Sequence, residues 1–248
     1  MPSPIGVRLL HKMRGWHHMD LTTRSLARLC VRSVLGAAVL IGPALPIHAQ
    51  EPGKPAAFSV LFVGNSHLFV NNVPRRVQQH LQAAKGRTRI QTFARGGAQL
   101  SSFTHRADVS AALNSRVWDV VVLQEASATF LSPGGRQRFR RAIDWFRQRI
   151  PRKTRIVLYQ TWPWRDGSRY FNGRGSNTKH MWQVMSRAYA EVARRPRVTI
   201  APVGHCWVGS AKRAALYSAD GNHASVAGSR FAARVIARTI ARGVPSGC

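Results

Sequence analysis

The sequence predicts an α/β domain built on a parallel sheet that helices cover on both faces. Five short apolar runs are spaced along the chain and end in glycine or polar residues, as strands buried on both faces do. Segments with apolar residues at helical spacing alternate with these runs. The chain has 248 residues, of which 44% are hydrophobic. That is enough for one domain with a sizeable core.

The five predicted strands are rich in aromatic and β-branched residues, which favour extended backbone. The first, at 58–63, is an almost unbroken apolar run that stops at Gly64. The other four are predicted at 88–94, 118–123, 154–161 and 198–203. Right-handed crossovers between successive parallel strands would then place helices on the sheet.

Helical periodicity is clearest at 133–150, where Phe139 and Phe146 share one side and arginines occupy the other. Pro74 suits the first turn of a helix at 74–85, because that turn has no partner for a backbone N–H. The remaining helices are predicted at 102–113, 180–194, 204–215 and 224–241.

The first 49 residues have the features of a signal peptide. Three arginines, Arg24, Arg28 and Arg32, precede an apolar stretch, and the small residue Ala49 follows it at a suitable cleavage point. Glycine and prolines interrupt the apolar stretch, which argues against the alternative of a membrane-spanning anchor.

The expected organisation is therefore a targeting segment at 1–49, a linker at 50–57 and one domain at 58–248. The predicted location is periplasmic or secreted. The translation start is open between Met1 and Met19, because the region before the apolar core is long.

Charge is the strongest compositional bias. The formal net charge is +29, from 38 basic and nine acidic residues. Nucleic acid, an anionic membrane surface or an acidic substrate would each suit such a balance. Because the arginines are spread along the whole chain, a solvated basic surface is the simpler interpretation. Export would separate the protein from intracellular nucleic acid, so no nucleic-acid partner is expected, and association with an anionic cell-envelope surface stays open.

Two cysteines, Cys206 and Cys248, remain after removal of the targeting segment. In an oxidising compartment they could form a disulfide, and the alternative is two free thiols. No pair of cysteine and histidine has the spacing of a zinc site. No Gly-x-Gly-x-x-Gly follows a predicted strand. We therefore expect neither a metal nor a cofactor.

A candidate catalytic set combines two distant segments. Ser66 follows the first strand after Gly64 and Asn65, and Asp220-x-x-His223 precedes the last helix. In open α/β sheets, ligands bind at the carboxyl ends of the strands. A serine, a histidine and an aspartate can supply a nucleophile, a general base and a group that orients the base. Neither segment alone is specific for a catalytic site. Their positions, one after the first strand and the other before the last helix, favour that interpretation.

Two further segments complete a recognisable order, since Gly96-Gly97 follows the second strand and Gln124-Glu125 follows the third. Over about 58–241, this order resembles that of the SGNH/GDSL hydrolase superfamily. The resemblance implies a three-layer α/β/α, flavodoxin-like fold with a five-stranded parallel sheet. It also implies hydrolysis of carboxylic esters, often of acyl groups on carbohydrates or lipids. The Gly-Asn-Ser-His and Leu-Gln-Glu variants are similar to those of a secreted subgroup.

By this resemblance, Ser66 would be the nucleophile, His223 the general base and Asp220 the residue that holds the imidazole in its productive tautomer. Asn65 stands where the family usually has aspartate. That aspartate is not a triad member in the family, so the change is compatible with activity.

The resemblance also implies three donors to an oxyanion, namely the N–H groups of Ser66 and Gly97 and the side chain of Gln124. Gln124 stands where the family has asparagine. Its amide is one methylene further from the backbone, and the alternative role is to satisfy buried backbone groups. Glu125 is not a candidate, because an ionised carboxylate only accepts hydrogen bonds.

The aromatic loop at 162–177 is a candidate substrate-binding segment. Trp162 and Trp164 could stack on a sugar ring or anchor the loop on the core. His67 could contact substrate or lie on the surface at the start of a helix. The expected substrate is a small-molecule or glycan ester. The alternatives are a catalytically silent, glycan-binding member of the same fold and a polyanion-binding protein.

Overall fold

A computed structural model describes residues 57–244 and 247–248. The predicted targeting segment and all of the predicted linker except its last residue lie outside these residues, so the proposed organisation of the chain stays a prediction. No helix within the described ranges has both the length and the apolar character needed to cross a bilayer.

The predicted parallel sheet is confirmed. Its strands are β1 (Phe58–Gly64), β2 (Thr88–Ala94), β3 (Val120–Gln124), β4 (Arg155–Tyr159) and β5 (Val198–Ala201). They pair in the order β2-β1-β3-β4-β5, and every pair is parallel. This is the flavodoxin-like strand order. The carboxyl ends of β1 and β3 lie side by side at the centre, since Val63 pairs with Leu123.

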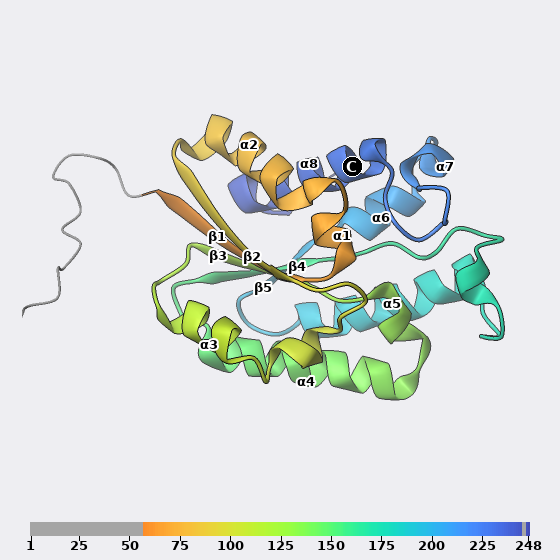
Figure 1. Ribbon diagram of the computed structural model, residues 1–248, viewed down its shortest axis with the longest axis horizontal. Coiled ribbons are helices and arrows are strands. Elements are labelled where there is room, and N and C mark those ends of the chain that lie inside the picture. The colour runs from red at the N-terminus through yellow and green to blue at the C-terminus, as the bar shows by residue number, and fades with distance from the viewer. Residues whose placement is uncertain (1–56, 245–246) are drawn as a thin grey trace, which may run out of the picture. The chain divides into compact units, whose positions relative to one another are not determined.

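Helices cover both faces of the sheet (Figure 1). One face carries α1 (Ser66–Phe69), α2 (Val73–Lys85), α6 (Val203–Val208), α7 (Arg213–Leu216) and α8 (Val226–Arg242). The other face carries α3 (Ala107–Asn114), α4 (Pro133–Arg149) and α5 (Thr178–Ala193). Short 3-10 turns are η1 (Val70–Asn72), η2 (Leu100–Phe103), η3 (Ser127–Leu131) and η4 (Arg169–Phe171). The predicted three-layer architecture is therefore correct.

The core forms on both sides of the sheet, because alternate side chains of a strand point to opposite faces. In β1, Val60 and Phe62 pack in one apolar cluster, and Leu61 and Val63 pack in the other. All four side chains are fully buried. The first strand is thus held from both faces, which fixes the position of the residues that follow it.

The long helices begin where the sequence supplies a capping side chain. The side chains of Asn72, Ser132, Asn177 and Ser225 each accept a hydrogen bond from a backbone N–H in the first turn of α2, α4, α5 and α8. Such caps satisfy N–H groups that have no partner within the helix. The cap at Ser225 starts α8 soon after the predicted catalytic segment.

Two segments that were each predicted as one helix are divided into two shorter elements, so these predictions are wrong. The segment predicted as one helix at 102–113 is η2 followed by α3. The hydroxyl groups of Ser102 and Thr104 donate to the carbonyls of Gln99 and Ser101, at 2.7 and 2.8 Å. Such bonds compete with helix formation. The segment predicted at 204–215 is likewise divided into α6 and α7.

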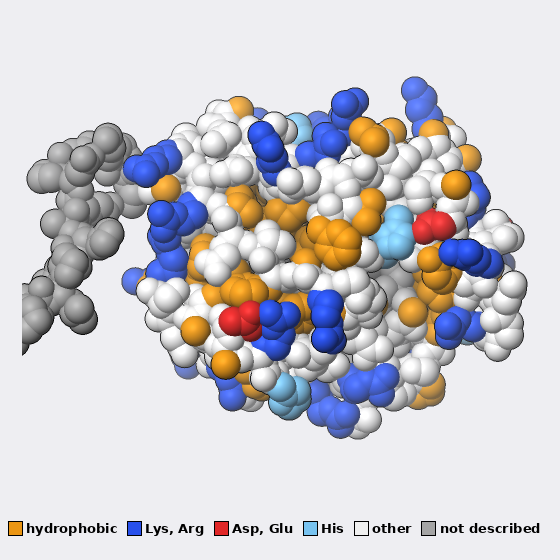
Figure 2. All heavy atoms as spheres, in the orientation of Figure 1, with side chains coloured by type: hydrophobic (Ala, Val, Ile, Leu, Met, Phe, Trp, Pro, Cys, Tyr) orange, Lys and Arg blue, Asp and Glu red, His pale blue; other side chains and the backbone are white. Residues whose placement is uncertain are grey.

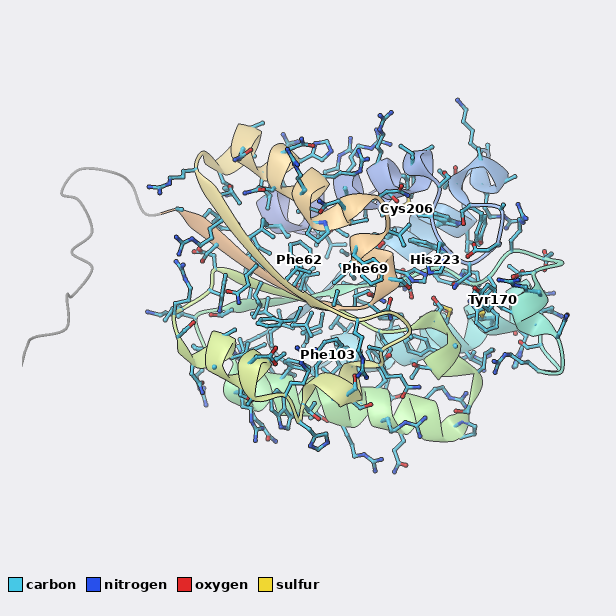
Figure 3. The ribbon with its side chains drawn as sticks, viewed as in Figure 1. Phe62, Phe69, Phe103, Tyr170, Cys206 and His223 are labelled. Atoms are coloured by element: carbon cyan, nitrogen blue, oxygen red, sulfur yellow. A yellow bond between two sulfur atoms is a disulfide. The ribbon has the colours of Figure 1, made fainter. Side chains whose placement is uncertain are left out.

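A disulfide joins Cys206 of α6 to Cys248 at the end of the chain, with 5.2 Å between the Cα atoms. From the sequence alone, a disulfide and two free thiols were both possible. The bridge ties the terminal residue to a helix whose Trp207 is completely buried in the core. Figure 3 shows Cys206 on the same face of the sheet as His223.

Candidate active site

Ser66 is the first residue of α1, directly after the turn that ends β1. Asn65 has extended backbone, and its side chain caps α1 by accepting a hydrogen bond from the His67 N–H at 3.1 Å. Gly64 leaves no room for a side chain, because a Cβ there would lie 2.4 Å from Oε1 of Gln124. The tight strand-to-helix turn therefore presents the Ser66 hydroxyl at the carboxyl edge of the sheet.

The structure brings the three predicted catalytic side chains into one hydrogen-bonded chain. Nε2 of His223 lies 2.8 Å from Oγ of Ser66, although the residues are 157 positions apart. Nδ1 of His223 lies 2.6 Å from Oδ2 of Asp220. The side chains of His223 and Asp220 are each 25% exposed, so a substrate can reach the imidazole. This is the geometry of a nucleophile, its base and the group that orients the base.

Asp220 is held in a turn that donates several hydrogen bonds to it. Its Oδ1 accepts from the Ser218 hydroxyl at 2.6 Å and from the N–H groups of Asn222 and His223, each at 2.9 Å. Partial burial by itself would raise the pKa of Asp220, but hydrogen bonds from Ser218, His223 and the Asn222 N–H outweigh it and hold the pKa well below its usual value. The carboxylate therefore stays ionised beside the imidazole.

The resemblance implies two backbone N–H donors to an oxyanion, those of Ser66 and Gly97, and the structure links the two segments that carry them. Gly97 lies in the turn after β2 with a φ of +66°, which glycine adopts readily. Asn65 Nδ2 donates to the Ala98 carbonyl at 3.0 Å, which brings this turn to the start of α1. Within the described residues, neither the Ser66 nor the Gly97 N–H donates to a protein group.

Gln124 does not take the position expected of it. Its side chain is fully buried, its Oε1 accepts from the Asn65 N–H at 2.8 Å, and its Nε2 donates to the Glu125 carbonyl at 2.7 Å. The expectation that its amide donates to a substrate oxyanion is therefore corrected. The reason lies in Gly64, whose missing side chain leaves the space that Gln124 fills. Gln124 satisfies buried backbone groups and so fixes the residue before Ser66.

We predict that Gln124→Ala lowers the free energy of unfolding by roughly 1–3 kcal/mol, because it leaves the buried Asn65 N–H without a partner. Turnover per folded molecule should fall less than the 10²–10³-fold that is typical for loss of an oxyanion donor. Urea unfolding and kcat per active site measure the two effects. A variant with unchanged stability and kcat lowered at least a hundredfold would restore the donor role.

Glu125 is a buried carboxyl group beneath the same edge of the sheet. It accepts hydrogen bonds from the N–H groups of Leu100 and Ala126, at 3.2 and 2.7 Å, and from the Thr129 hydroxyl at 3.0 Å. Burial raises its pKa to about 7, although these hydrogen bonds oppose the shift. Through Leu100, Glu125 anchors the segment that follows the Gly97 turn.

His67 lies in the core, although the sequence suggested a substrate contact or a surface position. Its ring centroid is 4.9 Å from that of Trp162 and 5.5 Å from that of His223. Among the described residues, neither of its ring nitrogens has a hydrogen-bond partner. Burial, followed by the charge of His223, lowers the pKa of His67 to about 3. A neutral imidazole thus packs against the ring of His223.

The two buried groups Glu125 and His67 should make the free energy of unfolding depend on pH in opposite directions. The folded-state pKa of Glu125 is raised from 4.5 to about 7, so its stabilising contribution is complete below pH 4.5 and is lost as the pH rises to 7. The folded-state pKa of His67 is lowered from 6.5 to about 3, so stability is lost as the pH falls from 6.5 to 3. Between pH 7.5 and 5, each contribution is about 2 kcal/mol.

We therefore predict that Glu125→Gln makes the chain lose stability as the pH falls from 7.5 to 5, because only the His67 contribution remains. His67→Phe should have the opposite effect and gain stability over the same range. Urea unfolding of both variants and the wild type at the two pH values measures the slopes. Equal pH slopes in all three proteins would contradict the assigned titrations.

Trp162 and Trp164 are anchors of the loop and not a sugar platform. They are 0% and 3% exposed. The indole of Trp162 stacks on Trp207 with ring centroids 3.7 Å apart, and its Nε1 donates to the Asn222 carbonyl at 2.9 Å. The expectation of substrate stacking is therefore wrong, because apolar packing encloses both rings. Trp162 instead supports the turn that carries Asp220 and His223.

Phe69 is a site residue that sequence reasoning missed. It lies three residues after Ser66, on the same side of α1, and its side chain is 50% exposed. A Cβ at Gly96 would lie 3.9 Å from Cζ of Phe69, so the ring lies beside the glycine turn. Figure 3 labels Phe69 and His223, and Figure 2, in the same orientation, shows hydrophobic side chains beside a histidine on this face of the molecule. The spacing of three would have identified Phe69 if the short helix had been predicted.

Comparisons with known proteins give matches among solved structures. No protein-family model matches the chain, and no curated protein matches it. Among solved structures, a protein from Slackia heliotrinireducens with a provisional assignment as an SGNH hydrolase is 31% identical, with a TM-score of 0.65. The match covers 75% of this chain and 100% of that one.

Two more distant structures share the fold. A DUF4886 family protein from Bacteroides uniformis is 19% identical with a TM-score of 0.62, and the match covers 75% of this chain and 83% of that one. A catalytic mutant of an acetylxylan esterase from Geobacillus stearothermophilus is 14% identical with a TM-score of 0.56, over 78% of this chain and 99% of that one. The strand order, the strand-end motifs and the 31% identity together show that the chain belongs to the SGNH/GDSL hydrolase superfamily.

Proposed function

We propose that the protein is a serine esterase in which Ser66 is the nucleophile, His223 the general base and Asp220 the orienting carboxylate. The observation that carries the proposal is the pair of hydrogen bonds from His223, 2.8 Å to Ser66 and 2.6 Å to Asp220. Superfamily membership supports hydrolase chemistry in general, and the arrangement of these side chains supports this assignment of roles.

In the first half-reaction, Nε2 of His223 takes the proton of Ser66 as Oγ attacks the ester carbonyl carbon. The negative oxygen of the tetrahedral intermediate accepts hydrogen bonds from the N–H groups of Ser66 and Gly97, which stabilise the charge. The intermediate then collapses, and the imidazolium donates its proton to the departing alcohol. Asp220 stabilises the imidazolium and stays ionised throughout.

In the second half-reaction, His223 removes a proton from a water molecule that attacks the acyl carbon. A second tetrahedral intermediate forms in the same oxyanion site. Its collapse releases the carboxylic acid and returns the proton to Oγ of Ser66. No metal or cofactor takes part in this scheme. The proton that leaves Ser66 departs with the alcohol, and the proton that returns to Oγ comes from the attacking water.

Phe69 gives the proposed substrate site an apolar wall beside the nucleophile. Since a half-exposed phenylalanine next to Ser66 can cover apolar atoms of an ester, we assign the acyl group to this side. The structural likeness to an acetylxylan esterase supports a small acyl group on a glycan as one candidate substrate. The signal-like N-terminal sequence and the Cys206–Cys248 disulfide support export to an oxidising compartment.

A panel of aryl esters with acyl chains of increasing length, together with acetylated sugars, tests this function. We expect wild-type protein to hydrolyse at least the short-chain esters, with a preference that shifts in Phe69→Ala. Hydrolysis that is equal in wild type and Ser66→Ala, or absent for every ester, would contradict the proposal.

A further inference from the structure

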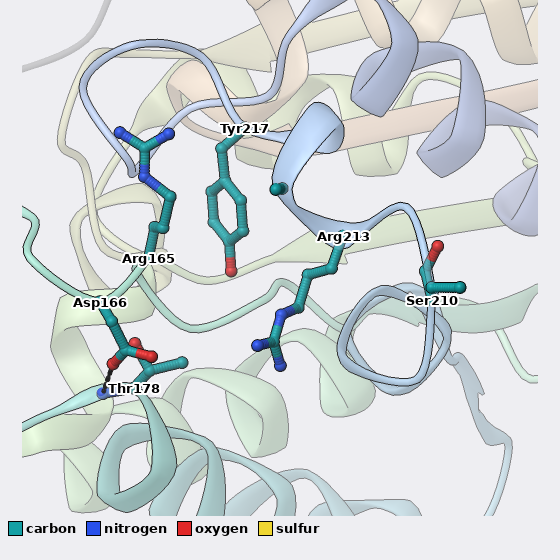
Figure 4. Close-up of a pocket in the computed structure, with 8 residues that line it drawn as sticks. Arg165, Asp166, Thr178, Ser210, Arg213 and Tyr217 are labelled. Carbon is teal, nitrogen blue, oxygen red and sulfur yellow. Dashed lines mark hydrogen bonds between the residues drawn. The ribbon is translucent and has the colours of Figure 1, made fainter.

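A cavity of about 280 Å³ lies beside the turn that carries Asp220, since its lining residue Arg165 donates to the carbonyls of Ala219 and Gly221. Its walls come from the loop after β4, the start of α5 and the segment from α6 to α7 (Figure 4). The polar lining residues are Arg165, Asp166, Thr178, Ser210, Arg213 and Tyr217. Neither the proposed reaction nor any comparison gives this cavity a role.

The charged groups of the cavity favour an anion. Arg165 and Arg213 present guanidinium groups from two different segments, and Asp166 supplies one carboxylate (Figure 4). Within the described residues, neither arginine forms an ion pair with Asp166. The cavity therefore carries a net positive charge. Guanidinium groups match the geometry of carboxylate and phosphate oxygens.

Two of the three hydroxyl groups of the cavity, those of Tyr217 and Thr178, already donate hydrogen bonds, whereas that of Ser210 accepts one from the Lys212 N–H. The Tyr217 hydroxyl donates to the Pro163 carbonyl at 2.8 Å, and the Thr178 hydroxyl donates to the Trp164 carbonyl at 2.6 Å. A neutral ligand would find few free donors here. A ligand with an acidic group would meet the guanidinium groups of Arg165 and Arg213, which lie on either side of Tyr217 in Figure 4.

The cavity is connected to the proposed catalytic turn through Arg165. The Arg165 N–H donates to the Gly221 carbonyl at 2.7 Å, and its Nη2 donates to the Ala219 carbonyl at 3.1 Å. These two carbonyls flank Asp220 in the chain. An anion that binds the Arg165 side chain competes with the Ala219 carbonyl for it and thereby acts on the turn.

We propose that this cavity is an anion-binding site for a carboxylate or phosphate group, and that its occupancy is coupled through Arg165 to the turn that carries Asp220. The acidic group belongs either to the ester substrate or to a separate small anion. The coupling rests on the proposed function, whereas the binding itself does not.

Binding is measured by isothermal titration calorimetry with inorganic phosphate and with glucuronate, on the Ser66→Ala chain so that catalysis plays no part. Arg213→Ala should weaken binding by about tenfold or more, because it removes a charge-assisted hydrogen bond. Asp166→Asn should tighten binding by about threefold, since it removes the opposing charge. Arg141→Ala, an exposed arginine of α4 on the other face of the sheet, is the matched control for net charge.

Equal weakening in Arg213→Ala and Arg141→Ala, or no binding of either anion, would overturn the site. Two kinetic arms then identify the source of the acidic group. An altered kcat for a neutral aryl ester in the presence of phosphate indicates a separate anion. A lower KM for acetylated glucuronate than for acetylated glucose, lost in Arg213→Ala, indicates the substrate. Binding without an effect in either arm would refute the coupling.

Discussion

Replacing Ser66 by alanine is expected to lower kcat by about 10⁶-fold, the typical cost of removing a triad nucleophile. No other group of the site can take over its role, because Nε2 of His223 is directed to Oγ of Ser66 at 2.8 Å. The substitution removes one partly exposed hydroxyl at the start of α1, so the melting temperature should stay close to that of wild type. Aryl ester hydrolysis and thermal unfolding measure the two expectations.

Ser186→Ala is the matched control, since Ser186 lies on α5 and, among the residues that the structure describes, its hydroxyl bonds only the Gln183 carbonyl of its own helix. It should retain wild-type kcat. A Ser66→Ala protein with kcat within tenfold of wild type would remove Ser66 from the mechanism and, with it, the assignment of the triad.

Replacing His223 by alanine should cost about as much as replacing Ser66, and Asp220→Asn should cost about 10⁴-fold. An asparagine amide can donate to Nδ1 of His223, which selects the tautomer that cannot accept a proton at Nε2. The 2.6 Å contact between Asp220 and His223 makes this tautomer effect direct.

The double variant His223→Ala/Asp220→Asn should be no slower than His223→Ala alone, because the carboxylate acts only through the imidazole. A double-mutant cycle on kcat/KM with one aryl ester measures this coupling. Losses that add in the double variant would show that the two residues act separately.

The strands and the catalytic edge could be predicted because they depend on local pattern. Strands buried on both faces need near-continuous apolar runs, and β1 and β3 have them. Once the sheet is parallel, the residues that follow its strands must share one edge. That argument placed Ser66 correctly after β1. It could not find α1, because a helix of four residues has too few positions to show a period.

The directions of side chains at the strand ends could not be predicted. Gln124 turns toward Gly64 because a glycine on the neighbouring strand leaves space, and this is a contact between distant parts of the chain. His67 and Trp162 are enclosed for a similar reason, since each packs against a ring from another segment. Their residue types suggested contact with a substrate. Because both side chains are buried against other rings, they instead support the position of His223.

Covalent labelling with a fluorophosphonate probe, followed by peptide mass spectrometry, tests the proposed triad most directly. Such a probe reacts with a serine that a neighbouring base activates. The wild-type chain should gain one probe per molecule, on Ser66, and Ser66→Ala should gain none. His223→Ala should label far more slowly, because its serine has no base. Labelling of a different serine, or of Ser66 at the same rate without His223, would contradict the proposed mechanism.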